Sequence, residues 1–81
     1  IPEYELSRIT KKVDRSGLPR PYVRIMWREY GAQIDIPEGA ITSAPKWRNA
    51  IRKIREYCAS WEIKFPDEAK LLKNIKELVQ S

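Results

Sequence analysis

Hydrophobic residues alternate with polar ones through the first half of the chain, which is the pattern of half-buried strands. The alternation is clearest in residues 22–28, where Val23, Ile25 and Trp27 share one face. Residues 33–36 alternate again and end at Pro37. Residues 6–14 fit either a strand or one face of a helix, and we favour the strand because residues 22–28 supply its hairpin partner.

Turn-forming residues separate these expected strands. Residues 14–21 contain Gly17, which can adopt a positive φ, and two prolines, which cannot continue a strand. Residues 29–32 form a second, shorter turn around Gly31. The three strands are therefore expected to form an antiparallel meander with one hydrophobic face that needs cover.

Hydrophobic residues in the second half recur every three or four positions, which is the spacing of amphipathic helices. Ser43 is a candidate N-cap of the first helix, Pro45 is tolerated in its first turn, and Pro66 and Asp67 open the second helix. The first hydrophobic stripe consists of Trp47, Ala50, Ile51, Ile54, Tyr57 and Cys58, and the second of Leu71, Leu72, Ile75, Leu78 and Val79. Residues 61–65 alternate and are a candidate fourth strand. The sequence predicts an α+β fold, a three-stranded antiparallel β-meander packed by two α-helices.

The length of 81 residues corresponds to a single small domain, which buries roughly 60–65% of the surface that its unfolded chain exposes. The chain begins with Ile1 rather than methionine, so we expect a piece of a larger protein. No hydrophobic run approaches the ~20 residues of a membrane span, and no signal-peptide pattern is present. We therefore expect a cytoplasmic location and no membrane partner.

Positive charge is concentrated in one region of the chain. Residues 8–55 hold twelve of the sixteen lysines and arginines and only four acids, a net charge of +8, whereas residues 56–81 carry −1. A regional excess focuses the electrostatic field on one surface, and this favours a polyanionic partner.

The expected first helix carries the strongest candidate binding site. Arg48, Arg52 and Arg55 lie on one flank of its hydrophobic stripe, and Lys46 and Lys53 lie on the other. Like charges three or four residues apart destabilise an isolated helix, and a nucleic-acid phosphate would relieve this repulsion. The alternative is a solvated face whose arginines lie over the sheet or pair with Glu29 or Asp35.

A second basic group belongs to the first hairpin. Lys12 and Arg15 precede or enter its loop, and Arg24 and Arg28 lie on the strand face opposite the hydrophobic residues. Such a ribbon could follow a phosphate backbone, although a polar outer sheet face has the same pattern. The wider group also includes Arg8, Lys11 and Arg20.

Aromatic residues at core spacing are expected to pack inside rather than to stack on bases. Trp27 and Trp47 fall on the faces assigned to the core, whereas Tyr22 and Tyr30 flank the central strand. Tyr30 lies at a turn, so it is the aromatic candidate for contact with nucleic acid.

Catalytic and metal-binding patterns are missing from the sequence. The chain has no histidine, and its single cysteine, Cys58, lies on the hydrophobic stripe, where a structural thiol is expected. It also has no phosphate-binding loop, CxxC, HExxH or GxSxG motif. We therefore expect no enzymatic activity, no cofactor and no metal.

The order of these elements resembles a family of uncharacterised accessory domains that precede the AAA+ motor in primase-helicase-like ATPases of plasmids, phages and mobile cassettes. The resemblance covers residues 6–79 and consists of an opening strand from Ile9 to Val13, a strand from Val23 to Trp27, a turn at Gly31, residues 34–37, a helix from Trp47, a short strand at Ile63 and a leucine-rich last helix. It implies a non-catalytic helper to a DNA-unwinding motor and supplies no active-site residues.

Two further interpretations of the sequence stay open. The sequence is also similar to the arm-type DNA-binding domain of tyrosine recombinases, in which residues 22–28 would be the central strand in a major groove. The second helix, from Asp67 to Gln80, departs from that module. The third interpretation is a protein-interaction module whose last helix docks on a neighbouring domain of the parent protein. The expected partners are thus nucleic acid, with DNA favoured, and neighbouring domains.

Overall fold

A three-stranded sheet and two helices make up the fold, as predicted. The computed structural model describes residues 3–10 and 12–80. Its elements follow the order β1 (Glu5–Ile9), β2 (Tyr22–Trp27), η1 (Arg28–Tyr30), β3 (Ala32–Pro37), η2 (Glu38–Thr42), α1 (Ala44–Ser60) and α2 (Glu68–Gln80), where η denotes a 3-10 helix. The sheet is antiparallel in the order β1-β2-β3, so the predicted α+β meander is confirmed.

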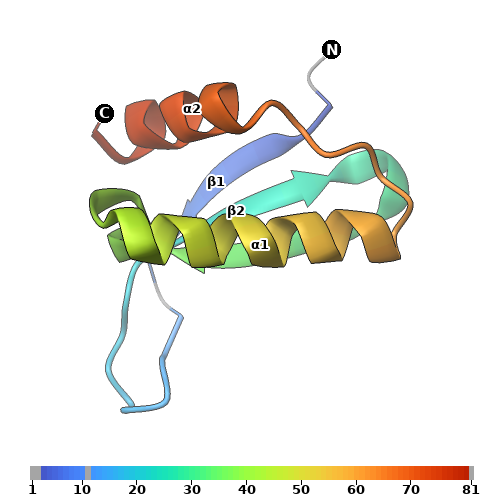
Figure 1. The fold of residues 1–81 in the computed structure, drawn as a ribbon. Coiled ribbons are helices and arrows are strands. Elements are labelled where there is room, and N and C mark those ends of the chain that lie inside the picture. Colours follow the sequence, from blue (N-terminus) through green and yellow to red (C-terminus); the bar gives the residue numbers. More distant parts are fainter. Residues whose placement is uncertain (1–2, 11, 81) are drawn as a thin grey trace.

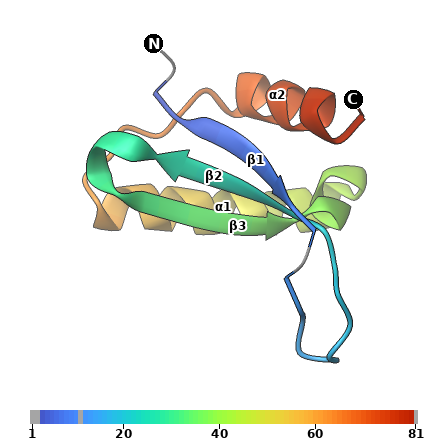
Figure 2. The ribbon, with the colours of Figure 1, turned by 180° about the vertical axis from the view of Figure 1, so that it is seen from behind.

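The two helices lie at different places on the sheet. In Figure 1, α1 crosses in front of β2 and β3, and α2 lies alongside β1. Figure 2, from behind, shows the opposite sheet face with no helix over it. One face of the sheet is therefore the core, and the other is open among the described residues.

Strand register decides which side chains enter the core. Ile25 of β2 pairs with Leu6 of β1 and with Ile34 of β3, which places all three on the inner face. Against this face pack the hydrophobic stripes of the helices, in which Ile54 is fully buried. The core comprises Val23, Ile25, Trp27, Ala32, Ile36, Ala40, Trp47, Ala50, Ile51, Ile54, Cys58, Ile63, Leu71 and Ile75. The predicted burial of Trp47 and Cys58 is confirmed, and burial raises the pKa of the Cys58 thiol.

The first strand is shorter than predicted. We expected residues 6–14, but β1 ends at Ile9, which pairs with Tyr22. The residue before Tyr22, next in line to pair with β1, is Pro21, which has no N–H to donate to the ladder. Val13 then forms only an isolated bridge with Pro19 and is exposed. The prolines of the partner segment therefore end the strand.

The candidate fourth strand at residues 61–65 is not formed, so that prediction is wrong. Glu62 has a left-handed φ of 57°, its N–H donates to the carbonyl of Ala59, and the N–H of Ile63 donates to the carbonyl of Cys58. These two bonds form a Schellman motif, which satisfies the last carbonyls of α1. Ile63 and Cys58 are both buried, which gives the motif its hydrophobic contact. The alternation in this segment reflects a helix cap that enters the core.

Local signals at the other element boundaries agree with the sequence. Gly31 ends η1 with a φ of 66°, in the region that glycine enters without strain. The Asp67 carboxylate accepts hydrogen bonds from the N–H groups of Ala69 and Lys70 and caps α2. Ser43 stands at the N-cap of α1 without a side-chain hydrogen bond.

Replacing Trp47 with alanine should lower the free energy of unfolding by about 3–5 kcal/mol, because the indole is only 9% exposed and packs between α1 and the sheet. The matched control is Trp61→Ala, since Trp61 is 43% exposed and touches one ring, that of Tyr57. Its cost should not exceed about 1.5 kcal/mol. Urea unfolding of both variants measures the difference, and equal losses would contradict the placement of Trp47 in the core.

Candidate nucleic-acid interface

Carboxylates already compensate the arginines on the open face of the sheet. Arg24 forms two hydrogen bonds with Asp35, Nε to Oδ1 at 2.9 Å and Nη2 to Oδ2 at 3.2 Å. Lys12 Nζ lies 3.1 Å from the same carboxylate and 4.6 Å from the centre of the Tyr22 ring. These hydrogen bonds to Arg24, and then to Lys12, lower the pKa of Asp35, and the same pairing raises the pKa of Arg24. Arg24 and Lys12 are thus part of an ion-pair network across the strands.

The other basic residues of the sheet are paired as well. Arg28 donates to Glu5, with Nη2 to Oε2 at 2.9 Å, at the end of the sheet. On the inner face, Arg8 forms a bidentate pair with Glu38, at 2.7 and 3.0 Å. Glu38 is only 9% exposed, and this pair raises the pKa of Arg8. The basic pattern of the first hairpin is therefore largely balanced by acids that are distant in the sequence.

The basic residues of α1 differ from those of the sheet. Lys46, Arg48, Arg52 and Lys53 are all exposed, and none forms an ion pair or hydrogen bond through its side chain within the described part of the chain. We call these four residues the α1 basic face. The alternative pairing with Glu29 or Asp35 is not formed among the described residues, and Asp35 lies on the open face of the sheet, away from α1, where Arg24 and Lys12 bind it.

Arg55 differs from Arg48 and Arg52, with which it was grouped, because its side chain has partners. Its Nη2 lies 3.4 Å from Glu68 at the start of α2, and its guanidinium lies 4.2 Å from the centre of the Phe65 ring. Arg55 therefore links α1 to the segment before α2, and we leave it out of the α1 basic face.

The two helices differ in their balance of charge. Helix α1 carries five basic residues and one acid, whereas α2 carries three basic residues and two acids.

The loop between β1 and β2 is a projecting hairpin that the sequence did not predict in detail. Figures 1 and 2 show it extending away from the sheet. Asp14 organises it by accepting hydrogen bonds from Ser16, from the N–H of Leu18 and from Arg20. Arg15, a predicted site residue, is exposed at its tip, and Lys11 lies outside the described residues.

Exposed aromatic residues lie at the opposite end of the sheet. Tyr30, the predicted candidate, is 48% exposed in η1. Trp61 is nearly as exposed. The sequence did not single it out, because hydrophobic and polar residues alternate in residues 61–65 and this pattern places Trp61 on the same strand face as Ile63. Its ring lies 6.2 Å from that of Tyr57, which in turn lies 6.1 Å from the buried Trp27. The α1 C-terminus thus ends in a row of aromatic rings that leads from the core to the surface.

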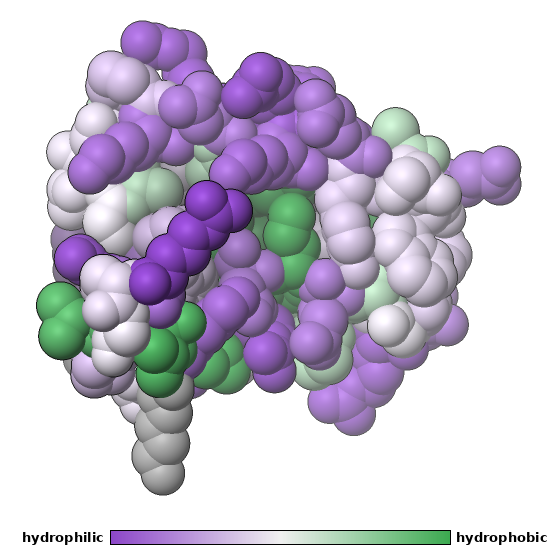
Figure 3. Space-filling model, turned by 90° about the horizontal axis from the view of Figure 1, so that it is seen from below, coloured by the Kyte–Doolittle hydropathy of each residue, from purple (hydrophilic) through white to green (hydrophobic). Residues whose placement is uncertain are grey.

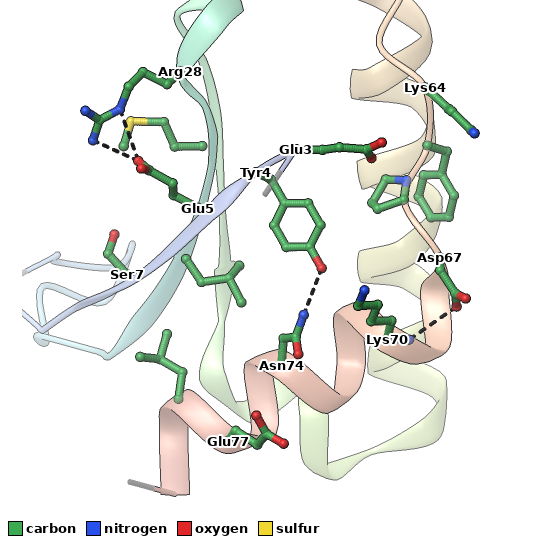
Figure 4. A pocket seen from close by; sticks show the side chains of 15 residues that line it. Glu3, Tyr4, Glu5, Ser7, Arg28, Lys64, Asp67, Lys70, Asn74 and Glu77 are labelled. Carbon is green, nitrogen blue, oxygen red and sulfur yellow. Dashed lines mark hydrogen bonds and ion pairs between the residues drawn. The ribbon is translucent and has the colours of Figure 1, made fainter. Parts of the chain in front are cut away.

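A groove of about 1410 Å³ separates β1 from α2. Figure 4 shows Tyr4 crossing it to meet Asn74, with the hydroxyl 3.2 Å from the side-chain nitrogen. Acidic and basic side chains alternate around its rim, including Glu3, Lys64 and Lys70. This mixed charge gives the groove no preference for a polyanion.

Hydrophilic residues dominate the face seen in Figure 3, and hydrophobic ones show there in small groups. Within residues 3–10 and 12–80, no cluster of three or more Cys, Asp or Glu side chains could hold a metal ion. In the same residues, no helix is both long and apolar enough to cross a membrane.

Comparison with known proteins gives no match. No protein-family model, no curated protein and no solved structure is similar to this chain at a significant level. The α1 basic face, defined by its exposure and its lack of acidic partners, is therefore the strongest basis for a functional proposal.

The carboxylate of Asp14 should titrate far below its usual range. Hydrogen bonds from Ser16, and then from Arg20, lower its pKa from 3.8 to about 2. Because the folded-state pKa is the lower one, the stabilisation of the hairpin is complete above pH 4 and is lost as the pH falls through about 2. Carbon-13 NMR of the Asp14 carboxyl group measures this pKa, with Asp14→Asn identifying the signal. A midpoint near 3.8 would mean that the hairpin network does not form in solution.

Proposed function

We propose that this domain is a non-catalytic nucleic-acid-binding accessory domain of a DNA-processing protein, and that it binds through the α1 basic face. One observation carries the proposal. Four exposed cations lie on a single helix with no acidic partner in the described chain, while the sheet arginines are paired. Nucleic-acid phosphates supply the missing negative charge, and release of their counterions drives binding.

The resemblance to accessory domains that precede AAA+ motors supports a place beside a DNA-unwinding motor in a mobile-element protein, and it rests on the sheet and the two helices, since the short strand at Ile63 is not formed. We accordingly expect the domain to act in the cytoplasm and to contact neighbouring domains of its parent. Nothing in this role requires a catalytic residue, a cofactor or a metal in the domain itself.

The arm-type interpretation is less favoured by the side-chain contacts. It would place β2 in a major groove, where Arg24 and Arg28 would contact DNA. Both arginines donate to carboxylates of neighbouring strands, so much of their positive charge is balanced within the domain. The open sheet face nevertheless has the architecture that this interpretation requires, and it stays a second candidate surface.

The protein-interaction interpretation depends on a free hydrophobic stripe on α2. Leu71 and Ile75 are fully buried in the core, where α2 packs on β1 and η2, and the partly buried Leu72, Leu78 and Val79 pack against that core. The two central residues of the stripe are therefore used within this domain, and only the partly buried Leu72, Leu78 and Val79 offer hydrophobic surface for docking.

Removing three charges from the α1 basic face should weaken nucleic-acid binding without lowering stability. In the variant Lys46→Ala, Arg48→Ala, Lys53→Ala, the slope of log K against log salt should become shallower by up to ~2.7 for a duplex, since each phosphate contact contributes about 0.9. Its melting temperature should stay equal or rise, because alanine favours helix and repulsion is relieved.

The matched control removes three exposed charges from α2, by Lys70→Ala, Lys73→Ala and Lys76→Ala. This variant has the same net charge but keeps the α1 basic face, so it should retain most of the affinity. Equal losses in the two variants would show that only overall charge matters, and the proposed surface would be wrong.

Substituting Arg24 with alanine separates the sheet from the helix as the binding surface. Asp35 would keep only Lys12 as a partner, so the melting temperature should fall and the pKa of Asp35 should rise toward its usual value. The salt slope of binding should not change. A stable Arg24→Ala variant with a shallower slope would favour the open face of the sheet over α1.

A further inference from the structure

The exposed side of α1 has a centre and two flanks with different chemistry. At about 100° per residue, Asn49 and Glu56 lie opposite the buried stripe, and Arg52, which was expected on one flank, lies within about 40° of the same direction, so the three form a central line. Arg48 lies to one side of this line, and Lys46 and Lys53 lie to the other, so that the flanks are roughly 140–160° apart around the helix axis. All six side chains are exposed.

This distribution places positive charge on the two flanks of the exposed side, and side chains with different hydrogen-bonding groups along its central line. Glu56, the single acid of α1, stands on the central line and not on a flank. A helix that binds a polyanion by charge alone gains nothing from a central amide and carboxylate. A helix in the major groove of duplex DNA gains from both, because its flanks face the two phosphate backbones and its centre faces the base edges.

The three central residues are of types that distinguish base pairs. Asparagine forms a bidentate pair with adenine, arginine does so with the O6 and N7 atoms of guanine, and glutamate accepts a hydrogen bond from the cytosine amino group. Asn49 and Arg52 are one turn apart, and so are Arg52 and Glu56. The line therefore can contact successive base pairs along a groove.

The position of α1 in the fold permits this approach. The helix has 17 residues, and Figure 1 shows it on the outside of the molecule with no other element in front of it. Its diameter with side chains, about 10–12 Å, matches a major groove about 12 Å wide. The major groove of duplex RNA is too narrow for a helix, so the fit selects DNA.

We propose that α1 is a recognition helix for the major groove of duplex DNA, with Asn49, Arg52 and Glu56 on base edges and Arg48, Lys46 and Lys53 on phosphates. This inference rests on the proposed nucleic-acid binding by the α1 basic face and adds to it the duplex, the groove and base specificity.

The first experiment compares the affinity of the 81-residue chain for one sequence as duplex DNA, single-stranded DNA and duplex RNA at a single salt concentration. The duplex DNA should bind at least about tenfold more tightly than either other form, as specific binding exceeds non-specific binding by far more than that. Selection from a randomised duplex pool should then yield a preferred site of a few base pairs. Equal affinity for the three forms, or a pool without preference, would overturn the recognition helix.

Variants of the central line test the base contacts on that selected site. Asn49→Ala should reduce discrimination at one position by about fivefold to a hundredfold while leaving the salt slope unchanged. Arg52→Lys keeps the charge but loses the planar fork, so it should reduce a guanine preference with the same slope. Lys53→Ala is the contrasting control and should weaken binding to all sequences alike.

Purine analogues without the N7 atom locate the groove, because N7 is displayed only on the major-groove side. Their insertion in the selected site should weaken DNA binding by the unmodified chain and have a smaller effect on binding by the Asn49→Ala, Arg52→Ala double variant. Unchanged binding by the unmodified chain would overturn the major-groove assignment.

The outcomes separate this inference from the proposed function. Binding that depends on the α1 basic face but ignores strand form, base identity and N7 would retain the proposed function and refute the recognition helix. Failure to bind any nucleic acid at low salt would refute both.

Discussion

The burial of a single face of the sheet is the constraint on which the rest of the structure depends. A three-stranded sheet of five- and six-residue strands is stable only when a hydrophobic layer covers it, and here α1 and α2 cover the face formed by β2 and its neighbours. Ile25 and Ile54 are both fully buried where α1 crosses the sheet. Because the cover lies on one side only, the other sheet face and the outer half of α1 are left to solvent.

These two solvent-facing surfaces have opposite electrostatic character although both are rich in arginine. The meander brings Asp35 beside Arg24 and Glu5 beside Arg28, so opposite charges on neighbouring strands form short pairs. Along α1, by contrast, no neighbouring element in the described part of the chain pairs a carboxylate with the exposed cations, apart from Glu68 at Arg55. The proposed role in nucleic-acid binding follows from this difference, because a surface with unpaired cations gains most from a phosphate partner.

The ends of α1 limit how that surface is presented. At its C-terminus the Schellman motif places Glu62 in a left-handed conformation and returns Ile63 to the core. Arg55 is held by Phe65 and Glu68 nearby. These contacts fix the last turns of the helix to the body of the domain, so the first three turns are the part that projects free side chains. The candidate base-contacting residues lie within or next to those turns.

The sequence alone determined the fold class, the three strands, both helices and the buried positions of Trp47 and Cys58. The spacing of hydrophobic residues is a local property of the chain, and it indicates both the type of element and the face that is buried. It did not determine the end of β1, where Pro21 on the opposite strand removes a donor, or the loop at residue 62, where helix capping overrides alternation. Nor did it show that Arg24 forms an ion pair whereas Arg48 does not. Pairing between residues far apart in the chain depends on strand register, and only the tertiary structure brought Asp35 to one arginine and left the other in solvent.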